Sequence, residues 1–426
     1  MDTLILNFLL YLLYTIYSFL KCRYLTVHNI LSIWFVFIAL MGIISVNNGY
    51  YQIIYGRVSN LPLEPYLWCF ISFLFLMLPL QKLNYKQILI YDVPQGSDEN
   101  FITLIKLPIL ILFAFTIVYI PSVVMVLTLN NVSEAYHMQR VDGDELYSYS
   151  LVGKIIIWVG RKFYNWFFAI LFFWSVWNIN LSKKYSKFLI FVLLVSALPY
   201  FLRTISTGGR GGFIFFTLQL LLIVTPILFY ISKKQKLKIV IFLSICATLS
   251  LPYIISMSEG RTEMGNESSI GSIVRYLGEP FPNLGNVLWN KVNTFLEGRR
   301  MYPELFGYTV DGSESQYDLF REWERVSGIP MLNYKTIYGD FYVEFGPVLA
   351  LILIASIGIL MNMYLRRRRL SFYQIPIYAY YIDVCSTAPL WFNRRNTGDL
   401  LIVLQLIIFS YMLRKYMKSK RIKNKE

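Results

Sequence analysis

Two arginines in a glycine-rich stretch are the residues of this chain best suited to hold an anion. The stretch from Arg203 to Gly212 reads R-T-I-S-T-G-G-R-G-G and lies between two apolar runs. Glycines allow positive φ and bring successive N–H groups close to a ligand, and the arginine fork matches phosphate oxygens. The pattern predicts a phosphate or pyrophosphate site made of Arg203, Gly208, Gly209, Arg210 and Gly211. The alternative is a tight interhelical turn with a snorkelling arginine. An ATP-binding P-loop is excluded, because the sequence lacks G-x-x-x-x-G-K-[ST].

Two carboxylates could add acid–base chemistry. Asp340 and Glu344 are four residues apart in Y-G-D-F-Y-V-E-F-G, so on a helix they share one face. Either could act as a general base that removes a proton from an attacking hydroxyl group. The candidate catalytic residues are therefore Arg210, Asp340 and Glu344. The alternative for either carboxylate is a charge near a helix N-terminus that complements the macrodipole.

The composition predicts an all-α, polytopic membrane protein. Of 426 residues, 56% are hydrophobic and only 15% are charged, which is too apolar for a soluble domain. The net charge of +15 comes from short basic clusters between apolar runs, a positive-inside pattern rather than a nucleic-acid-binding one. The four cysteines show no C-x-x-C spacing and the two histidines are far apart, so we expect no metal site, disulfide framework or cofactor.

Apolar runs long enough to cross a bilayer predict about eleven spans. They are Leu4–Leu20, Ile30–Val46, Tyr66–Leu80, Leu107–Leu127, Phe163–Asn178, Phe188–Leu202, Phe213–Ile231, Ile239–Met257, Phe341–Leu365, Phe372–Pro389 and Leu400–Leu413. A basic cluster follows every odd-numbered span, so the N-terminus is expected outside and the C-terminus in the cytoplasm. Lys154 to Lys162 alternates basic and apolar residues, as a segment in the membrane interface does. Asp383 lies within the tenth span, where a carboxylate is either functional or interhelical glue.

One long hydrophilic segment stands apart, and it divides the chain into an N-terminal bundle (1–257), an external loop (258–335) and C-terminal helices with a basic tail (336–426). Within the loop, Glu279–Glu297 and Tyr317–Val326 have helical periodicity, the second with Ser315 as N-cap. Loop arginines and the tyrosine that follows are candidates to bind a lipid-linked sugar that carries phosphate. They are Arg261, Arg275, Arg299, Arg300 and Tyr338. Rings able to stack on sugars are Tyr302, Tyr308, Tyr317, Trp323 and Tyr334.

The turn T-G-G-R-G-G, the single large external loop and the helix start Y-G-D-F-Y-V-E-F-G-P together resemble the bacterial oligosaccharide repeat-unit polymerases, which are related to the O-antigen ligases. The resemblance implies that Arg210 binds the pyrophosphate, with Arg203 a weaker match. Tyr338, Asp340 and Gly346 match the helix start after the loop. Two departures exist: the loop has no histidine, unlike that of the ligases, and Arg261 to Gly271 and Arg275 to Gly285 miss an arginine–glycine spacing of some polymerases by one residue.

The resemblance implies an inverting, metal-independent glycosyltransferase of the C-type membrane fold in the bacterial inner membrane. It would polymerise undecaprenyl-pyrophosphate-linked repeat units into O-antigen or capsular polysaccharide on the outer face, as in lipopolysaccharide biosynthesis, without a cofactor. Expected partners are the lipid-linked oligosaccharide, membrane lipids, and the chain-length regulator and flippase of the pathway, but no nucleic acid. A lipid-linked oligosaccharide flippase or other transporter is the rival, although no internal repeat is visible in the sequence. A third hypothesis is that the protein is a scaffold of a capsule assembly complex.

Overall fold

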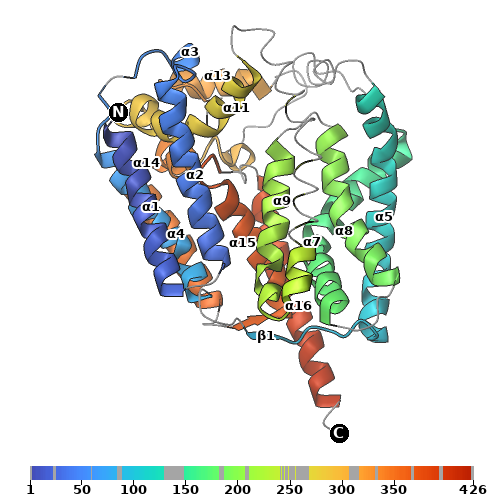
Figure 1. The fold of residues 1–426 in the computed structure, drawn as a ribbon. Coiled ribbons are helices and arrows are strands. Elements are labelled where there is room, and N and C mark those ends of the chain that lie inside the picture. The colour runs from blue at the N-terminus through green and yellow to red at the C-terminus, as the bar shows by residue number, and fades with distance from the viewer. Residues whose placement is uncertain are drawn as a thin grey trace. The chain divides into compact units, whose positions relative to one another are not determined.

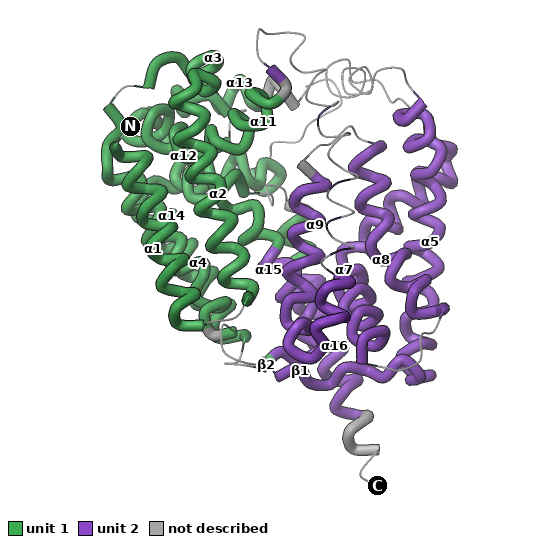
Figure 2. Tube along the Cα trace, viewed as in Figure 1, with its two compact units in different colours: residues 1–88, 270–369, 383–403 green, residues 89–269, 370–382, 404–426 purple. Residues whose placement is uncertain are grey.

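The computed structural model describes most of the chain as α-helices, with one two-stranded sheet (Figure 1). The described residues are 2–22, 25–58, 60–83, 89–128, 148–181, 187–206, 211–239, 268–306, 316–331, 334–365, 369–392 and 397–423, together with 241, 244, 248 and 255. Chain contacts define two compact units, each assembled from three stretches (Figure 2). Unit 1 comprises Met1–Ile88, Ile270–Arg369 and Asp383–Val403, and unit 2 comprises Leu89–Ser269, Leu370–Ile382 and Leu404–Glu426. The three ranges expected from the sequence, 1–257, 258–335 and 336–426, stay a prediction.

Nine helical segments within the described residues are long and apolar enough to cross a membrane. The helices that supply them are α1 (Asp2–Cys22), α2 (Val27–Asn47), α4 (Glu64–Lys82), α5 (Glu99–Thr128), α7 (Leu151–Leu181), α8 (Lys187–Ser206), α9 (Gly211–Val224) continued by the 3-10 helix η1 (Thr225–Phe229), α14 (Thr336–Tyr364) and α16 (Thr397–Lys423). The prediction of an all-α, multi-pass membrane protein is confirmed.

Two of the eleven predicted spans are not among these nine. Most of Ile239–Met257 lies outside the described residues. Phe372–Pro389 contains only η4 (Phe372–Gln374) and α15 (Ile375–Thr387), and α15 has 13 residues. At 1.5 Å per residue it is about 20 Å long, whereas a bilayer core is about 30 Å thick. The helix described here is therefore shorter than the predicted span: the capping box of Ser371 and Gln374 starts η4, which runs directly into α15, and a turn follows Thr387.

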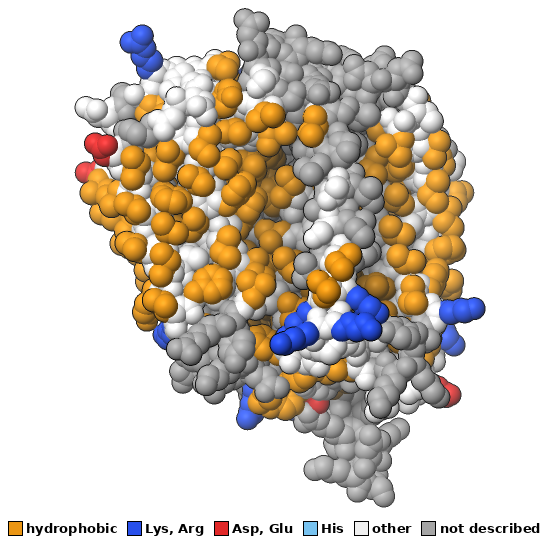
Figure 3. All heavy atoms as spheres, viewed as in Figure 1, with side chains coloured by type: hydrophobic (Ala, Val, Ile, Leu, Met, Phe, Trp, Pro, Cys, Tyr) orange, Lys and Arg blue, Asp and Glu red, His pale blue; other side chains and the backbone are white. Residues whose placement is uncertain are grey.

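Large apolar side chains remain exposed along the helices, as they do in proteins that face lipid. Leu13 on α1 is 63% exposed, Leu110 on α5 63%, and Met363 on α14 74%. Figure 3 shows hydrophobic side chains covering the outer faces of α1, α2 and α4 in unit 1 and of α5 in unit 2. Polar side chains such as Ser32 and Ser175 are buried instead. The lipid-facing pattern agrees with the membrane assignment made from composition.

The membrane helices of unit 1 are α1, α2, α4 and the second part of α14. A Cβ on Gly358 of α14 would lie 2.1 Å from the carbonyl oxygen of Phe75 on α4, so these two backbones can approach only because the residue is glycine. Gly346 interrupts α14 with φ 73° and ψ 175°, and Pro347 follows it. The helix therefore has two parts, Thr336–Phe345 and Pro347–Tyr364, and the predicted span Phe341–Leu365 includes the break between them.

Short helices form a separate layer at the end of unit 1 where the N-terminus lies (Figures 1 and 2). They are α3 (Gln52–Tyr55), α11 (Ser269–Gly278), α12 (Pro280–Asn283), the π-helix η2 (Leu284–Leu288), the 3-10 helix η3 (Pro303–Phe306) and α13 (Gln316–Ser327). The predicted helix Glu279–Glu297 is too long: helical structure ends at Leu288, because Trp289 is extended and Asn290 has φ 58°. The prediction of a helix at Tyr317–Val326 is confirmed by α13, while Ser315 lies outside the described residues.

In unit 2, α5, α7 and α8 pack against one another, and α9 packs on α7 and α8. An aromatic core holds the start of α5 to α7, with the rings of Phe101 and Trp174 centred 5.2 Å apart. Strand β1 (Leu89–Tyr91) pairs with β2 (Arg369–Ser371). The predicted interfacial segment Lys154 to Lys162 is continuous with the predicted span after it, since both belong to α7.

Candidate functional site

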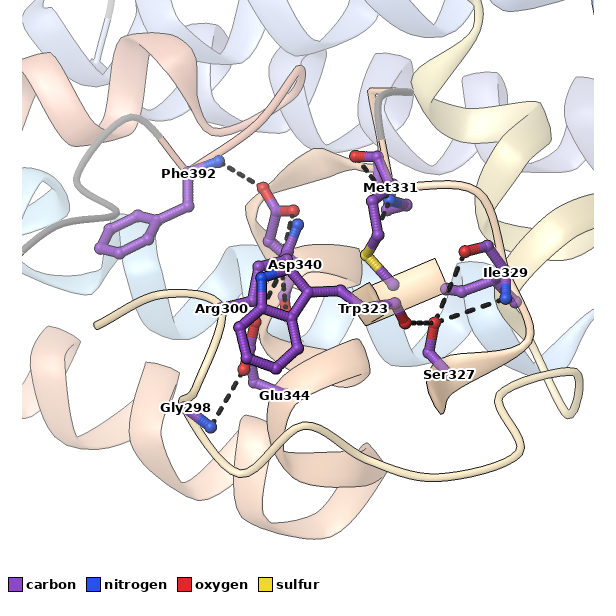
Figure 4. Close-up of polar contacts among 10 residues, drawn as sticks. Gly298, Arg300, Trp323, Ser327, Ile329, Met331, Asp340, Glu344 and Phe392 are labelled. Carbon is purple, nitrogen blue, oxygen red and sulfur yellow. Dashed lines mark hydrogen bonds and ion pairs between the residues drawn. The ribbon is translucent and has the colours of Figure 1, made fainter. Parts of the chain in front are cut away.

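The best-defined charged cluster of unit 1 joins Arg300 to the two predicted carboxylates (Figure 4). Arg300 donates from Nη2 to Oδ1 of Asp340 at 3.0 Å and from Nε to Oε1 of Glu344 at 2.8 Å. The three side chains are at most 1% exposed. Asp340 and Glu344 lie on the first part of α14, which confirms that their spacing places them on one helix face.

Each remaining carboxylate oxygen of this cluster accepts a backbone N–H. The N–H of Phe392 donates to Oδ2 of Asp340 at 2.7 Å, and the N–H of Gly298 donates to Oε2 of Glu344 at 3.0 Å. Gly298 has φ 91°, a conformation that a residue with a Cβ rarely adopts. The cluster therefore fastens three segments together: the loop at 298–300, the start of α14 and the chain at 392.

Backbone hydrogen bonds strengthen the attachment of the 388–392 segment. Thr336 donates from its N–H to the carbonyl of Leu390 at 2.9 Å, and Ile337 donates to the carbonyl of Ala388 at 2.7 Å. Thr336 has φ 66°, a costly conformation for a β-branched residue. Its hydroxyl oxygen accepts the N–H of Gly339 at 3.1 Å and so caps the first turn of α14. The helix start that carries both carboxylates is thus held rigidly.

Electrostatics keep Arg300 charged. Burial lowers the pKa of Arg300, but the negative charges of Asp340 and Glu344 outweigh burial and raise that pKa above its ordinary value. One guanidinium serves two carboxylates, and its Nη1 is buried without a hydrogen-bond partner in the described part of the chain. A guanidinium enclosed in this way ties the loop at 298–300 to α14, and its removal would leave two buried carboxylates without their cation.

A general base must present an oxygen to the hydroxyl group that it deprotonates. The oxygens of Asp340 and Glu344 are buried and each already accepts a hydrogen bond, so the geometry favours a positioning role for these two residues. Their role as a base stays a prediction. Arg300, predicted to bind substrate, belongs to the same enclosed cluster.

The predicted anion-binding turn lies between two helices of unit 2. Arg203 is exposed in the last turn of α8, which ends at Ser206, and Gly211 begins α9. The two helices pack closely: the rings of Tyr200 and Phe216 are stacked with centroids 4.3 Å apart. Gly208, Gly209 and Arg210 lie outside the described residues.

Gly212 has a packing reason to be glycine. A Cβ there would lie 2.5 Å from the hydroxyl oxygen of Thr204, so α8 and α9 can approach this closely only because the residue is glycine. At the start of α9, the first backbone N–H groups have no partners within the helix and the helix dipole is positive. A helix start of this kind suits an anion, and the exposed Arg203 in the last turn of α8 adds a positive charge to the same connection.

The other predicted binding residues differ in their surroundings. Arg275, at the end of α11, lies 3.6 Å from a carboxylate oxygen of Glu279, and Arg299 pairs with Glu297 at the surface, 3.0 Å apart. Tyr338 is fully buried, with its ring 6.4 Å from that of Phe35, so it packs in the core of unit 1. Arg261 lies outside the described residues. Nowhere in the described ranges do three His, Cys, Asp or Glu side chains gather as metal ligands would.

Sequence reasoning missed the groups that complete the Arg300 cluster and the ion pair of Arg275 with Glu279. The backbone N–H groups of Gly298 and Phe392 carry no signal in the sequence, since any residue type supplies one. Glu279 was one acidic residue among several in the loop, and only its position before Pro280 at a helix start distinguished it. Tyr55, which donates a hydrogen bond to Glu279, is 224 residues away from it along the chain.

Comparisons with known protein families, with curated proteins and with solved structures find no match to this chain.

Proposed function

We propose that this protein is a membrane glycosyltransferase that polymerises undecaprenyl-pyrophosphate-linked oligosaccharide repeat units into O-antigen or capsular polysaccharide. It would work in the bacterial inner membrane, with its N-terminus outside and its C-terminus in the cytoplasm. The observation that carries the proposal is the helical hairpin of α8 and α9 in unit 2. The sequence of this connection holds Arg203 and Arg210; Arg203 is exposed in the last turn of α8, and α9 begins at Gly211.

In the proposed reaction, a hydroxyl oxygen of the incoming lipid-linked unit bonds to the anomeric carbon of the growing chain. The bond from that carbon to the diphosphate oxygen breaks, and the diphosphate leaves with the electron pair while the hydroxyl proton passes to a base. Guanidinium groups and helix N–H groups would neutralise the charge that develops on the departing diphosphate. Inversion at the anomeric carbon follows from a single displacement.

A cellular test separates the turn arginine from arginines in general. Arg210→Ala should abolish polymer while single lipid-linked units and the level of the protein stay normal, and Arg210→Lys should restore part of the activity if charge is what matters. Arg161→Ala is a matched control, since Arg161 is an exposed arginine on α7 of the same unit. Wild-type chain length in Arg210→Ala would count against the site.

A further inference from the structure

A second group of charged and aromatic side chains in unit 1 differs from the enclosed Arg300 cluster because parts of it reach the surface. We name it the Glu279 cluster. Its members are Tyr55 at the end of α3, Arg275 and Tyr276 on α11, Glu279, Tyr334 and Trp391.

Glu279 is the centre of this cluster and is 3% exposed. Its Oε2 accepts a hydrogen bond from the hydroxyl of Tyr55 at 3.1 Å and lies 3.6 Å from Nη1 of Arg275. Its Oε1 accepts the N–H of Tyr334 at 3.3 Å. Gly278, the residue before it, brings α11 against α2, since a Cβ there would lie 2.3 Å from the carbonyl oxygen of Met41. The carboxylate is therefore positioned by its own hydrogen bonds and by the close packing of α11 on α2.

Aromatic rings continue from the carboxylate toward the surface. The rings of Tyr276 and Tyr334 are centred 4.6 Å apart, and those of Tyr334 and Trp391 are 4.9 Å apart. On the other side, Tyr55 stacks on Tyr51 at 4.7 Å. Tyr55, Tyr276, Tyr334 and Trp391 are each partly exposed, and the side chain of Arg275 is 17% exposed.

Membrane-interface tyrosines and tryptophans form belts at the level of the lipid headgroups, and a belt does not require a buried carboxylate. Here the rings surround an ion pair that is mostly removed from water, and the hydrogen bonds from Tyr55 and Tyr334 to Glu279 offset part of the free-energy cost of that burial. Burial, followed by the charge of Glu279, raises the pKa of Tyr55 above its ordinary value, so the phenol stays a hydrogen-bond donor.

The charges of the cluster select its ligand. Arg275 and Glu279 together have no net charge, and the carboxylate would repel a phosphate or diphosphate. Sugar rings, in contrast, have apolar C–H faces that stack on partly exposed aromatic rings and hydroxyl groups that bond to the partly exposed guanidinium of Arg275. Glu279 is buried and both of its oxygens already accept hydrogen bonds, so its part is to position Arg275 and Tyr55. Neutral carbohydrate is therefore the class of ligand that this combination of side chains fits.

We propose that the Glu279 cluster is a carbohydrate-binding subsite, which holds sugar residues of the lipid-linked oligosaccharide and makes no contact with the diphosphate. This inference rests on the proposed function, because it takes its substrate class from there. It differs from that function in one respect that can be measured: the cluster should bind the oligosaccharide after lipid and diphosphate have been removed.

The test uses the full-length protein in detergent and, as probe, the repeat-unit oligosaccharide released by mild acid from the lipid-linked pool of the source strain. Binding is followed by saturation-transfer NMR. Trp391→Ala and Glu279→Gln should each weaken binding by about tenfold or more, and Trp391→Phe, which keeps a ring, should weaken it less. Trp158→Ala is the control, because Trp158 on α7 is 66% exposed and outside the cluster. Tyr276→Ala, at a partly exposed ring, serves if Glu279→Gln fails to fold.

Unchanged binding in the folded cluster variants, or no binding of the free oligosaccharide to the wild-type protein, overturns the subsite. If the wild-type protein makes polymer and the cluster variants bind the oligosaccharide as tightly as the wild type, the subsite is refuted and the proposed function stands. If the cluster variants lose oligosaccharide binding but the wild-type protein joins no units, the subsite stands and the proposed function fails.

Discussion

Removing the Arg300 guanidinium should destabilise unit 1 far more than removing the guanidinium beside it in the sequence. Arg300→Met leaves Asp340 and Glu344 buried, adjacent and without their cation. Loss of one partner from a buried ion pair costs about 3–5 kcal/mol. For a unit of this size, that loss should lower the midpoint of thermal unfolding by roughly 6–20 °C.

Arg299→Met is the matched control, since Arg299 is 43% exposed and pairs with Glu297, which is 69% exposed. Pairs of that kind contribute less than about 1 kcal/mol, so the midpoint should fall by no more than roughly 4 °C. A third variant, Arg300→Met with Asp340→Asn and Glu344→Gln, removes all three charges and should recover part of the lost stability.

Three buried cysteines supply the assay. Cys22, Cys69 and Cys385 are the free cysteines that the described ranges contain, and all three belong to unit 1. In a Cys246→Ser background, which removes the fourth cysteine of the sequence, a thiol-reactive fluorescent dye added to the protein in detergent and heated reports the unfolding of that unit. If Arg300→Met and Arg299→Met unfold at the same temperature, the Arg300 cluster does not hold unit 1 together and the reasoning is refuted.

Three further changes test other parts of the fold. Gly358→Ala should cost about 1–3 kcal/mol, because its Cβ would meet the backbone of Phe75, and an unchanged unfolding midpoint would refute this reason. Gly346→Ala should cost about 1–3 kcal/mol, because alanine is strained at φ 73° and ψ 175°; a midpoint equal to wild type would contradict this. Burial, then nearby carboxylates, raises the pKa of Tyr302 to about 12. The stability that Tyr302 contributes is therefore present below pH of about 10, the unfolded value, and is lost as pH rises through the folded value. Tyr302→Phe should show a smaller loss of stability over that interval in the same dye assay, and an identical loss would show that Tyr302 is not responsible.

Local patterns in the sequence predicted the helices well. Apolar runs of membrane-spanning length located nine of the helical segments, and the spacing of Asp340 and Glu344 placed both on one face of α14. Length alone did not predict how short α15 is, because residues 372–389 are apolar enough for a span but are mostly buried by protein, and the helix ends at Thr387. Hydropathy does not distinguish burial in protein from burial in lipid.

Long-range contacts account for the rest of what the sequence could not show. Arg300 lies 40 residues before Asp340, and Phe392 lies 52 residues after it, so neither contact has a periodic signal. The position of Glu279 among aromatic rings depends on Gly278 crossing α2, and the sequence offers no measure of helix crossing. Spacing reveals which residues share a helix face, whereas the partner of that face is determined by the tertiary fold.

The polymerase and transporter hypotheses predict opposite results for the purified protein in liposomes that carry undecaprenyl-pyrophosphate-linked repeat units on one face. The proposal that this protein is a glycosyltransferase predicts a ladder of linked chains, with one undecaprenyl pyrophosphate released for each bond formed. Movement of intact single units across the bilayer, with no linked chains and no released carrier, would contradict it.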